Sequence, residues 1–126
     1  MKIYKIKALL LALIVPLFFI SGCDSGNEVP VPLPLNELAA TMDKAFSKAK
    51  TGTKSLATQV VSAVQAKDYS KAFLDLQALI GAPDLTKQQA NVAGRALLTV
   101  NSLMQTAETQ GDAKSAETMR IYRQNK

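Results

Sequence analysis

Cys23 has the most distinctive chemistry in this chain, because it is the only cysteine among 126 residues. A cysteine side chain can act as a nucleophile, bind a metal or carry a covalent lipid. With no second cysteine, a disulfide within the chain is excluded. Cys23 directly follows Ile20, Ser21 and Gly22, which end a short apolar segment. Its role is therefore inferred from that segment.

The segment before Cys23 has the layout of a secretory signal. Residues 1–7 contain three lysines and no acidic residue, and residues 8–20 carry no charge. That uncharged run is shorter than the about 20 residues that a membrane-spanning helix needs. Ser21 and Gly22 are small, as signal cleavage requires. We expect residues 1–22 to be a signal peptide, cut between Gly22 and Cys23.

Ile20-Ser21-Gly22-Cys23 resembles the lipobox of bacterial lipoproteins, in which an aliphatic residue and two small residues precede a cysteine. The resemblance implies that Cys23 is the lipid attachment site and that its thiol carries a diacylglyceryl group. Two or more acyl chains hold a protein firmly on a bilayer, since each buried methylene contributes about 0.8 kcal/mol. The alternative is an ordinary secretory signal with a chance cysteine.

The same resemblance implies a location and a first partner. The body would be exported to the periplasmic side of the bacterial cell envelope, with the membrane as its partner through the lipid on Cys23. Asp24 follows the cysteine. In lipoproteins of enteric bacteria an aspartate at this position favours the inner membrane.

A proline-rich segment separates Cys23 from the rest of the chain. Prolines at 30, 32 and 34 restrict the backbone and favour an extended conformation. We predict that residues 23–35 form a lipidated, extended tether. At about 3.1 Å per residue, the twelve residues after Cys23 could span roughly 35 Å.

Composition limits the chemistry of the remaining residues 36–126. The chain has no histidine, so the commonest general base and metal ligand is missing. Three of its 15 basic residues lie in the signal, which leaves 12 basic against 10 acidic residues. This balance does not favour nucleic-acid binding. We expect no catalytic residue, no metal site and no cofactor.

Two short motifs near residue 50 resemble those of penicillin-binding enzymes. Ser47-Lys48-Ala49-Lys50 has the form S-x-x-K, and Lys50-Thr51-Gly52 has the form K-T-G. In those enzymes the motifs lie far apart in sequence and converge in the fold. Here they overlap in a short chain, which indicates a solvated helical segment.

Apolar residues recur at helical spacing from residue 36 onward, and no strand pattern occurs. We predict an all-α fold, a small bundle of three to four antiparallel helices. The expected helices cover residues 36–67, 69–80, 87–109 and 113–124, with a break of the first at Gly52 as the alternative. Candidate N-caps are Asn36, Asp68, Thr86 and Asp112, and Gly81 is a candidate left-handed C-cap.

Leu56 to Pro83 resembles one unit of a tetratricopeptide repeat, a helical hairpin. A second unit would need a turn near Asn101, where the helical pattern continues instead. A weaker repetition pairs Asp68 and Ala72 with Asp112 and Ala116, 44 residues later. A generic bundle is the preferred interpretation over a repeat protein.

We predict a non-enzymatic binding or scaffolding module that captures a peptide or protein between its helices. Tyr69, Phe73 and Tyr122 are candidate wall residues of such a groove, although they also suit the core. The alternative function is a structural envelope protein that associates with the membrane surface or cell wall without a discrete ligand. For that alternative, positive charge would come from Lys44, Lys48, Lys50 and Lys54, and a second basic group from Arg120, Arg123 and Lys126.

Overall fold

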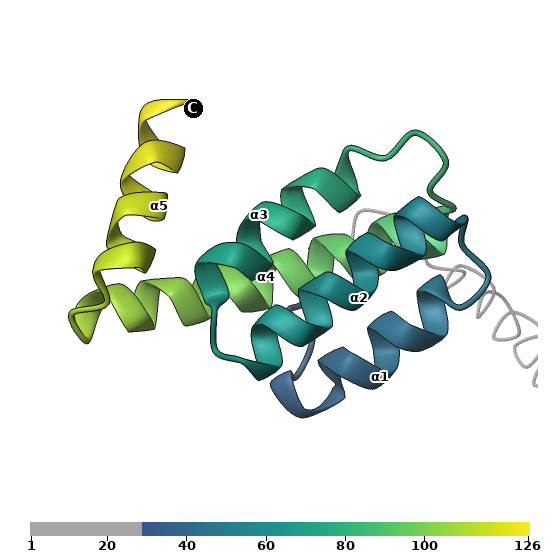
Figure 1. The fold of residues 1–126 in the computed structure, drawn as a ribbon, viewed down its shortest axis with the longest axis horizontal. Helices are drawn as coiled ribbons and strands as arrows, with labels where there is room; N and C mark the ends of the chain where they lie inside the picture. The colour runs from purple at the N-terminus through teal and green to yellow at the C-terminus, as the bar shows by residue number, and fades with distance from the viewer. Residues whose placement is uncertain (1–28) are drawn as a thin grey trace, which may run out of the picture.

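The computed structural model of the chain describes residues 29–126, and this part is an all-helical bundle (Figure 1). The predicted fold class is therefore confirmed. Helices α1 to α4 pack side by side, whereas α5 projects from one end of α4 (Figure 1). The predicted cleavage site, Cys23 and Asp24 lie outside the described residues. The helices are α1 (Leu35–Phe46), α2 (Thr51–Gln65), α3 (Tyr69–Ile80), α4 (Lys87–Thr109) and α5 (Ala113–Gln124).

The prediction of one continuous helix over residues 36–67 is wrong. The segment is divided into α1 and α2 by Ser47–Lys50, so the described residues form five helices instead of three to four. A continuous helix over these 32 residues would be about 48 Å long, at 1.5 Å per residue. The break lets α1 fold back on α2 and bury its apolar face there. The break also differs from the alternative, because Gly52 lies inside the first turn of α2.

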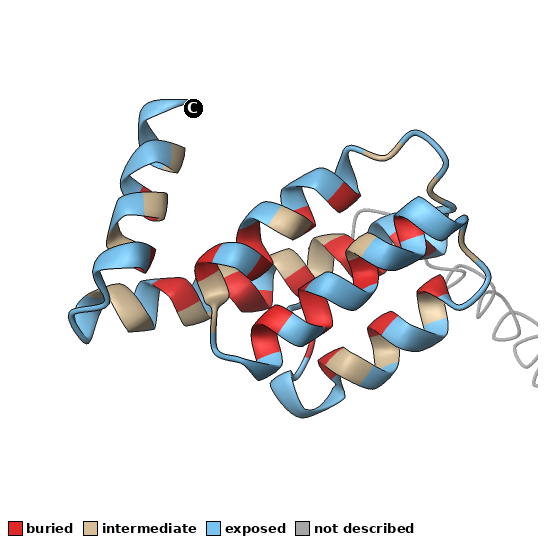
Figure 2. Cartoon of the chain, in the orientation of Figure 1, coloured by how far each residue is buried: buried red, intermediate tan, exposed pale blue. Residues whose placement is uncertain are grey.

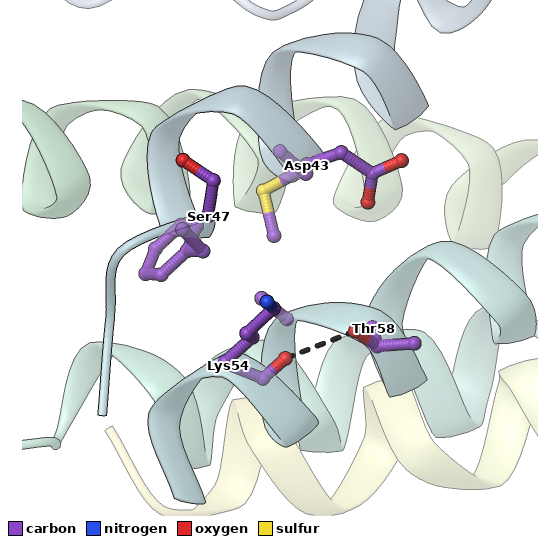
Figure 3. Close-up of a pocket in the computed structure, with 7 residues that line it drawn as sticks. Asp43, Ser47, Lys54 and Thr58 are labelled. Carbon is purple, nitrogen blue, oxygen red and sulfur yellow. Dashed lines mark hydrogen bonds between the residues drawn. The ribbon is translucent and has the colours of Figure 1, made fainter. Parts of the chain in front are cut away.

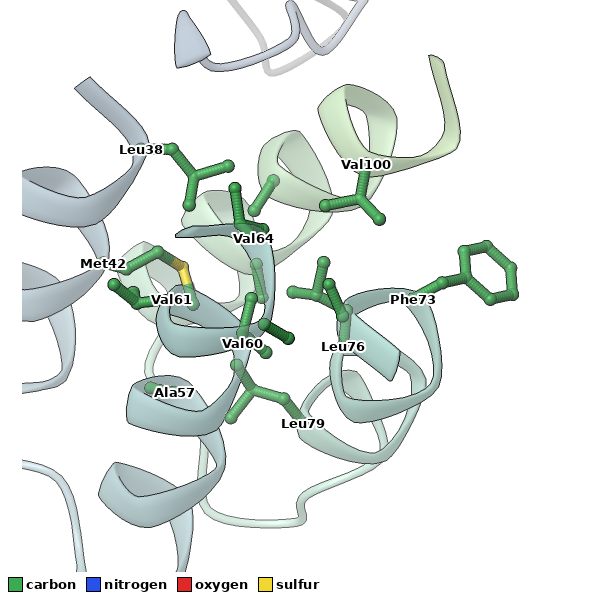
Figure 4. Packing of buried hydrophobic residues seen from close by; sticks show 14 of the residues in the cluster. Leu38, Met42, Ala57, Val60, Val61, Val64, Phe73, Leu76, Leu79 and Val100 are labelled. Carbon is green, nitrogen blue, oxygen red and sulfur yellow. The ribbon is translucent and has the colours of Figure 1, made fainter. Parts of the chain in front are cut away.

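The core lies where the inward faces of α1 to α4 meet, and α5 is mostly exposed (Figure 2). Figure 4 shows side chains from α1, α2, α3 and α4 converging on one cluster. Burial of each large apolar side chain contributes about 1.5–3 kcal/mol. The largest fully buried apolar side chains are those of Leu38, Met42, Phe46, Val60, Leu76, Leu79, Val100 and Met104.

The end of the proline-rich segment is part of the body. Leu33 is only 3% exposed, and the Thr99 hydroxyl donates a hydrogen bond of 2.6 Å to its carbonyl. The Arg95 guanidinium donates to the Val31 carbonyl at 2.8 Å. The expected free spacer is therefore shorter than twelve residues. Helix α1 also begins at Leu35, one residue before the predicted N-cap Asn36, and no side chain caps its N-terminus.

The predicted caps of the later helices are confirmed. Asp68 and Asp112 each accept a hydrogen bond from the backbone N–H three residues on, and Thr86 forms a capping box with Gln89. Gly81 is not left-handed, since its φ is −76°. The left-handed residues in the described part are Lys67 and Gly111.

Candidate functional site

An open hollow between α3 and α5 has a largely apolar lining. Its volume is about 270 Å³, and it lies between the outer side of α3 and the last two turns of α5. Leu74 and Ile121, which both line it, are 57% and 46% exposed. We name it the α3–α5 groove, lined by Phe73, Leu74, Gln77, Thr118, Ile121, Tyr122 and Asn125.

The aromatic wall of the groove joins α3 to α5. The ring of Phe73 points away from the other labelled core side chains in Figure 4. It meets Tyr122 edge to face, with ring centroids 5.1 Å apart and planes at 81°. This arrangement contributes about 0.5–1.5 kcal/mol beyond area burial. Phe73 is only 3% exposed, so it is a core residue as well as a wall residue.

The structure brings together two of the three predicted wall residues. Phe73 and Tyr122 line the α3–α5 groove, but Tyr69 lies at the start of α3 and lines a different hollow with Leu38 and Val64. Tyr69 is separated from the other two residues along the helix axis, because it lies one full turn before Phe73 in α3. Tyr69 is partly buried against the core and shares this hollow with residues of α1 and α2.

Leu74 and Ile121 were missed as candidate wall residues. Both lie beside the inward stripe of their helices: Leu74 follows the buried Phe73, and Ile121 precedes the half-buried Tyr122. Their apolar character outside the stripe was the available signal. The sequence pattern does not reveal that the two positions face one another across neighbouring helices.

Charges around the groove are largely paired. Arg120 pairs with Glu117, and Arg123 pairs with Glu108 of α4. These hydrogen bonds lower the pKa of the Glu117 carboxyl and raise the pKa values of both guanidinium groups. Lys126 lies 5.0 Å from the centroid of the Tyr122 ring. In the predicted basic group at the C-terminus, the two arginines are therefore paired with acids of α5 and α4, whereas Lys126 lies over an aromatic ring.

A second hollow, of about 260 Å³, lies between α1 and α2 (Figure 3). It contains Ser47 of the S-x-x-K motif, with Asp43, Lys54 and Thr58. The Ser47 hydroxyl donates to the Lys44 carbonyl at 3.0 Å, and the Thr58 hydroxyl donates to the Lys54 carbonyl at 3.0 Å. Both hydroxyls thus bond to the backbone of their own turn, and no base is aligned with either. The arrangement does not support nucleophilic chemistry.

Two further properties of residues 29–126 bear on function. This range holds no group of three or more His, Cys, Asp or Glu side chains able to bind a metal ion. None of its helices combines the length and the apolar character needed to traverse a bilayer. Comparisons of the chain with protein-family models, curated proteins and solved structures found no match.

Proposed function

We propose that the chain is a lipid-anchored bacterial lipoprotein whose helical body is a non-enzymatic binding or scaffolding module in the cell envelope. The pattern Ile20-Ser21-Gly22-Cys23 after a basic and apolar leader supports the anchor. The α3–α5 groove supports the binding role and is the single observation that carries it. Leu74 and Ile121 give it apolar lining side chains that are about half exposed.

The form of the groove favours a protein segment as its ligand. Small-molecule sites are concave and usually enclose about 300–1,000 Å³. The α3–α5 groove is smaller and open, and it runs between two helices. An amphipathic helix or a short apolar segment fits such a groove by placing a few apolar side chains along it. Because Leu74 and Ile121 are already about half buried, covering the rest of each side chain would contribute about 1 kcal/mol.

A non-enzymatic role is supported by the chemistry of the described side chains. Serine and threonine hydroxyls in the α1–α2 hollow bond to backbone carbonyls. The chain has no histidine to act as a base. The carboxylates of Asp68 and Asp112 cap helices. These residues have structural roles that account for their positions.

The anchor is tested by Cys23→Ser. We expect this variant to leave the membrane fraction, because the substitution removes the acyl chains, while its helical circular dichroism stays unchanged. Fractionation of the inner from the outer membrane in the unaltered protein tests the expectation from Asp24. A Cys23→Ser protein that remains membrane-bound would refute the anchor.

The groove is tested by placing a photo-crosslinking amino acid at Leu74 in cells that produce the full chain. We expect adducts with one discrete protein, which disappear when Ile121→Lys places a charge in the groove. The matched control is the crosslinker at Gln59, an exposed position on α2. Adducts equal at both positions, or none at Leu74, would contradict the binding role. The second result would favour a structural envelope protein without a discrete ligand.

A further inference from the structure

Charge is distributed unequally between the two ends of the bundle. The last turn of α1, the connection to α2 and the first turn of α2 carry four exposed lysines, and none forms an ion pair with a carboxylate of residues 29–126. All ion pairs found within this range involve α3, α4 or α5 and their caps. We name the unpaired group the lysine cluster: Lys44, Lys48, Lys50 and Lys54.

Nearby groups leave the lysine cluster with an excess of positive charge. Asp43 shares the α1–α2 hollow with Lys54, and Asp84 accepts a hydrogen bond from the Thr53 hydroxyl. The side chain of Gln89 donates to the Ala45 carbonyl, which places the beginning of α4 beside the end of α1. Lys87 starts α4 and so adds a fifth cation to this end. This end of the bundle therefore carries five lysines and two aspartates, an excess of positive charge.

The short chain between Cys23 and the body limits how far the body could lie from a membrane that holds Cys23. Val31 is held by Arg95 of α4, so at most eight residue steps separate it from Cys23. Eight residues span at most about 29 Å when fully extended. Helix α4 alone, with 23 residues, is about 35 Å long. With a lipid on Cys23, Val31 could therefore lie at most about 29 Å from the anchor point, which is less than the length of α4.

The α3–α5 groove lies toward the other end of the bundle. Helix α5 follows the C-terminal end of α4, whereas the lysine cluster lies near the N-terminal end of α4 (Figure 1). Val31 and Leu33 contact α4 at Arg95 and Thr99, between these ends. The tether length therefore allows either end to approach the membrane, and the charge distribution selects between them.

We propose that the lysine cluster contacts the phosphate groups of anionic phospholipids in the membrane that carries the Cys23 anchor, which turns the α3–α5 groove away from the bilayer. This proposal rests on the proposed lipidation of Cys23. Lysine ammonium groups are mobile point charges that bind phosphates without a fixed geometry. Their attraction to an anionic surface acts within a Debye length of about 8 Å at physiological salt.

The test uses the purified mature lipoprotein, whose Cys23 is acylated, so that an introduced cysteine is the single free thiol. A fluorophore is attached at Thr51→Cys, within the lysine cluster, or at Gln110→Cys, at the α4–α5 turn. The protein is inserted into phosphatidylcholine vesicles with or without phosphatidylglycerol, and a headgroup-linked quencher is included. We expect phosphatidylglycerol to increase quenching at position 51 and not at position 110, with the increase lost at high salt.

Charge removal completes the test. Replacing the four lysines of the cluster with glutamine should abolish the increase at position 51. The matched control removes the same charge elsewhere, at Lys67, Lys71, Lys114 and Lys126, and should preserve it. Circular dichroism checks that both variants fold. Equal quenching at the two positions, or an increase that survives removal of the cluster, would overturn the orientation alone. A purified chain without acyl groups would instead refute the anchor, and the orientation with it.

Discussion

The α2–α3 and α4–α5 hairpins close through the same turn, yet only the first continues into a fully packed helix. Residues related by 44 positions make matching backbone hydrogen bonds. Asp68 donates to the Ala63 carbonyl at 2.9 Å, and Asp112 donates to the Ala107 carbonyl at 2.9 Å. The weak repetition seen in the sequence thus marks a real structural equivalence of two turns.

The helices that follow these turns differ in what they bury. In α3 the apolar side chains Phe73, Leu76 and Leu79 are inside the core. The positions 44 residues later are Glu117, Arg120 and Arg123, and they are exposed. Helix α5 instead buries Ser115 and Met119, on another face. The same turn can therefore begin a core helix or a peripheral one, depending on the side chains that follow it.

This difference accounts for the α3–α5 groove. With charged residues where α3 has its core positions, α5 cannot cover the outer side of α3, and it projects from the end of the bundle (Figure 1). Leu74 and Ile121 remain exposed between the two helices. An open apolar groove is thus a consequence of a hairpin that repeats its turn without repeating its apolar pattern.

The largest expected difference in stability is between alanine substitutions at equivalent positions of α3 and α5. Leu76→Ala should lower the free energy of unfolding by about 2–5 kcal/mol, because it leaves a cavity in the core. Arg120→Ala, at the equivalent position of α5, should cause no resolvable change, since its ion pair with Glu117 is exposed. Urea denaturation measures both. Equal losses would refute the difference in packing.

A smaller effect is expected at the left-handed residues of the two turns. Lys67 has φ 58° and Gly111 has φ 92°. A side chain in this conformation costs roughly 1 kcal/mol, so Lys67→Gly should stabilise the protein and Gly111→Ala should destabilise it by about that amount. Gly94→Ala, inside α4 with open space around it, is the control and should stabilise. Thermal unfolding that shifts in the same direction for Gly94→Ala and Gly111→Ala would contradict equivalent turns.

The smallest expected effect is a loss of unfolding free energy at acid pH. The hydrogen bond from Lys114 and then that from the Lys71 N–H lower the pKa of Asp68, and Ser115, through its hydroxyl and N–H, lowers the pKa of Asp112. A lowered folded-state pKa stabilises the fold above the unfolded pKa of about 3.9, and this contribution is lost as pH falls through the folded value. Unfolding free energy should thus decline below about pH 4.

The acid prediction has its own matched variants. Asp68→Asn and Asp112→Asn keep an N-cap residue but cannot ionise. Together they should flatten the decline of unfolding free energy with falling pH, while Glu117, whose pKa is also lowered by Arg120, retains part of it. A double variant with an unchanged acid slope would show that these caps do not carry the dependence.

Local patterns in the sequence sufficed for most of the fold. The caps Asp68, Thr86 and Asp112 and three of the four predicted helices match the structure. Each cap is formed by a hydrogen bond between residues three positions apart, so it can be recognised from the local sequence. The division of residues 36–67 was not predictable in this way, because the apolar stripes of α1 and α2 are in phase and both are buried in one core. The turn between α1 and α2 depends on the packing of their two apolar faces in the core.

The candidate site was only partly predictable for a related reason. Phe73 and Tyr122 lie on the inward stripes of their helices and could be named as apolar aromatic candidates. Their contact depends on how α5 sits against α3, which helical periodicity does not specify. The docking of Leu33 on α4 was missed because prolines on either side favour extended backbone whether or not the segment is packed.

The account depends on a lipid at Cys23, and intact mass spectrometry of the protein purified from membranes tests this most directly. We predict a mature chain that begins at Cys23, with the added mass of acyl groups localised to the N-terminal peptide. A chain that retains residues 1–22, or one that begins at Cys23 with an unmodified thiol and amine, would contradict the anchor.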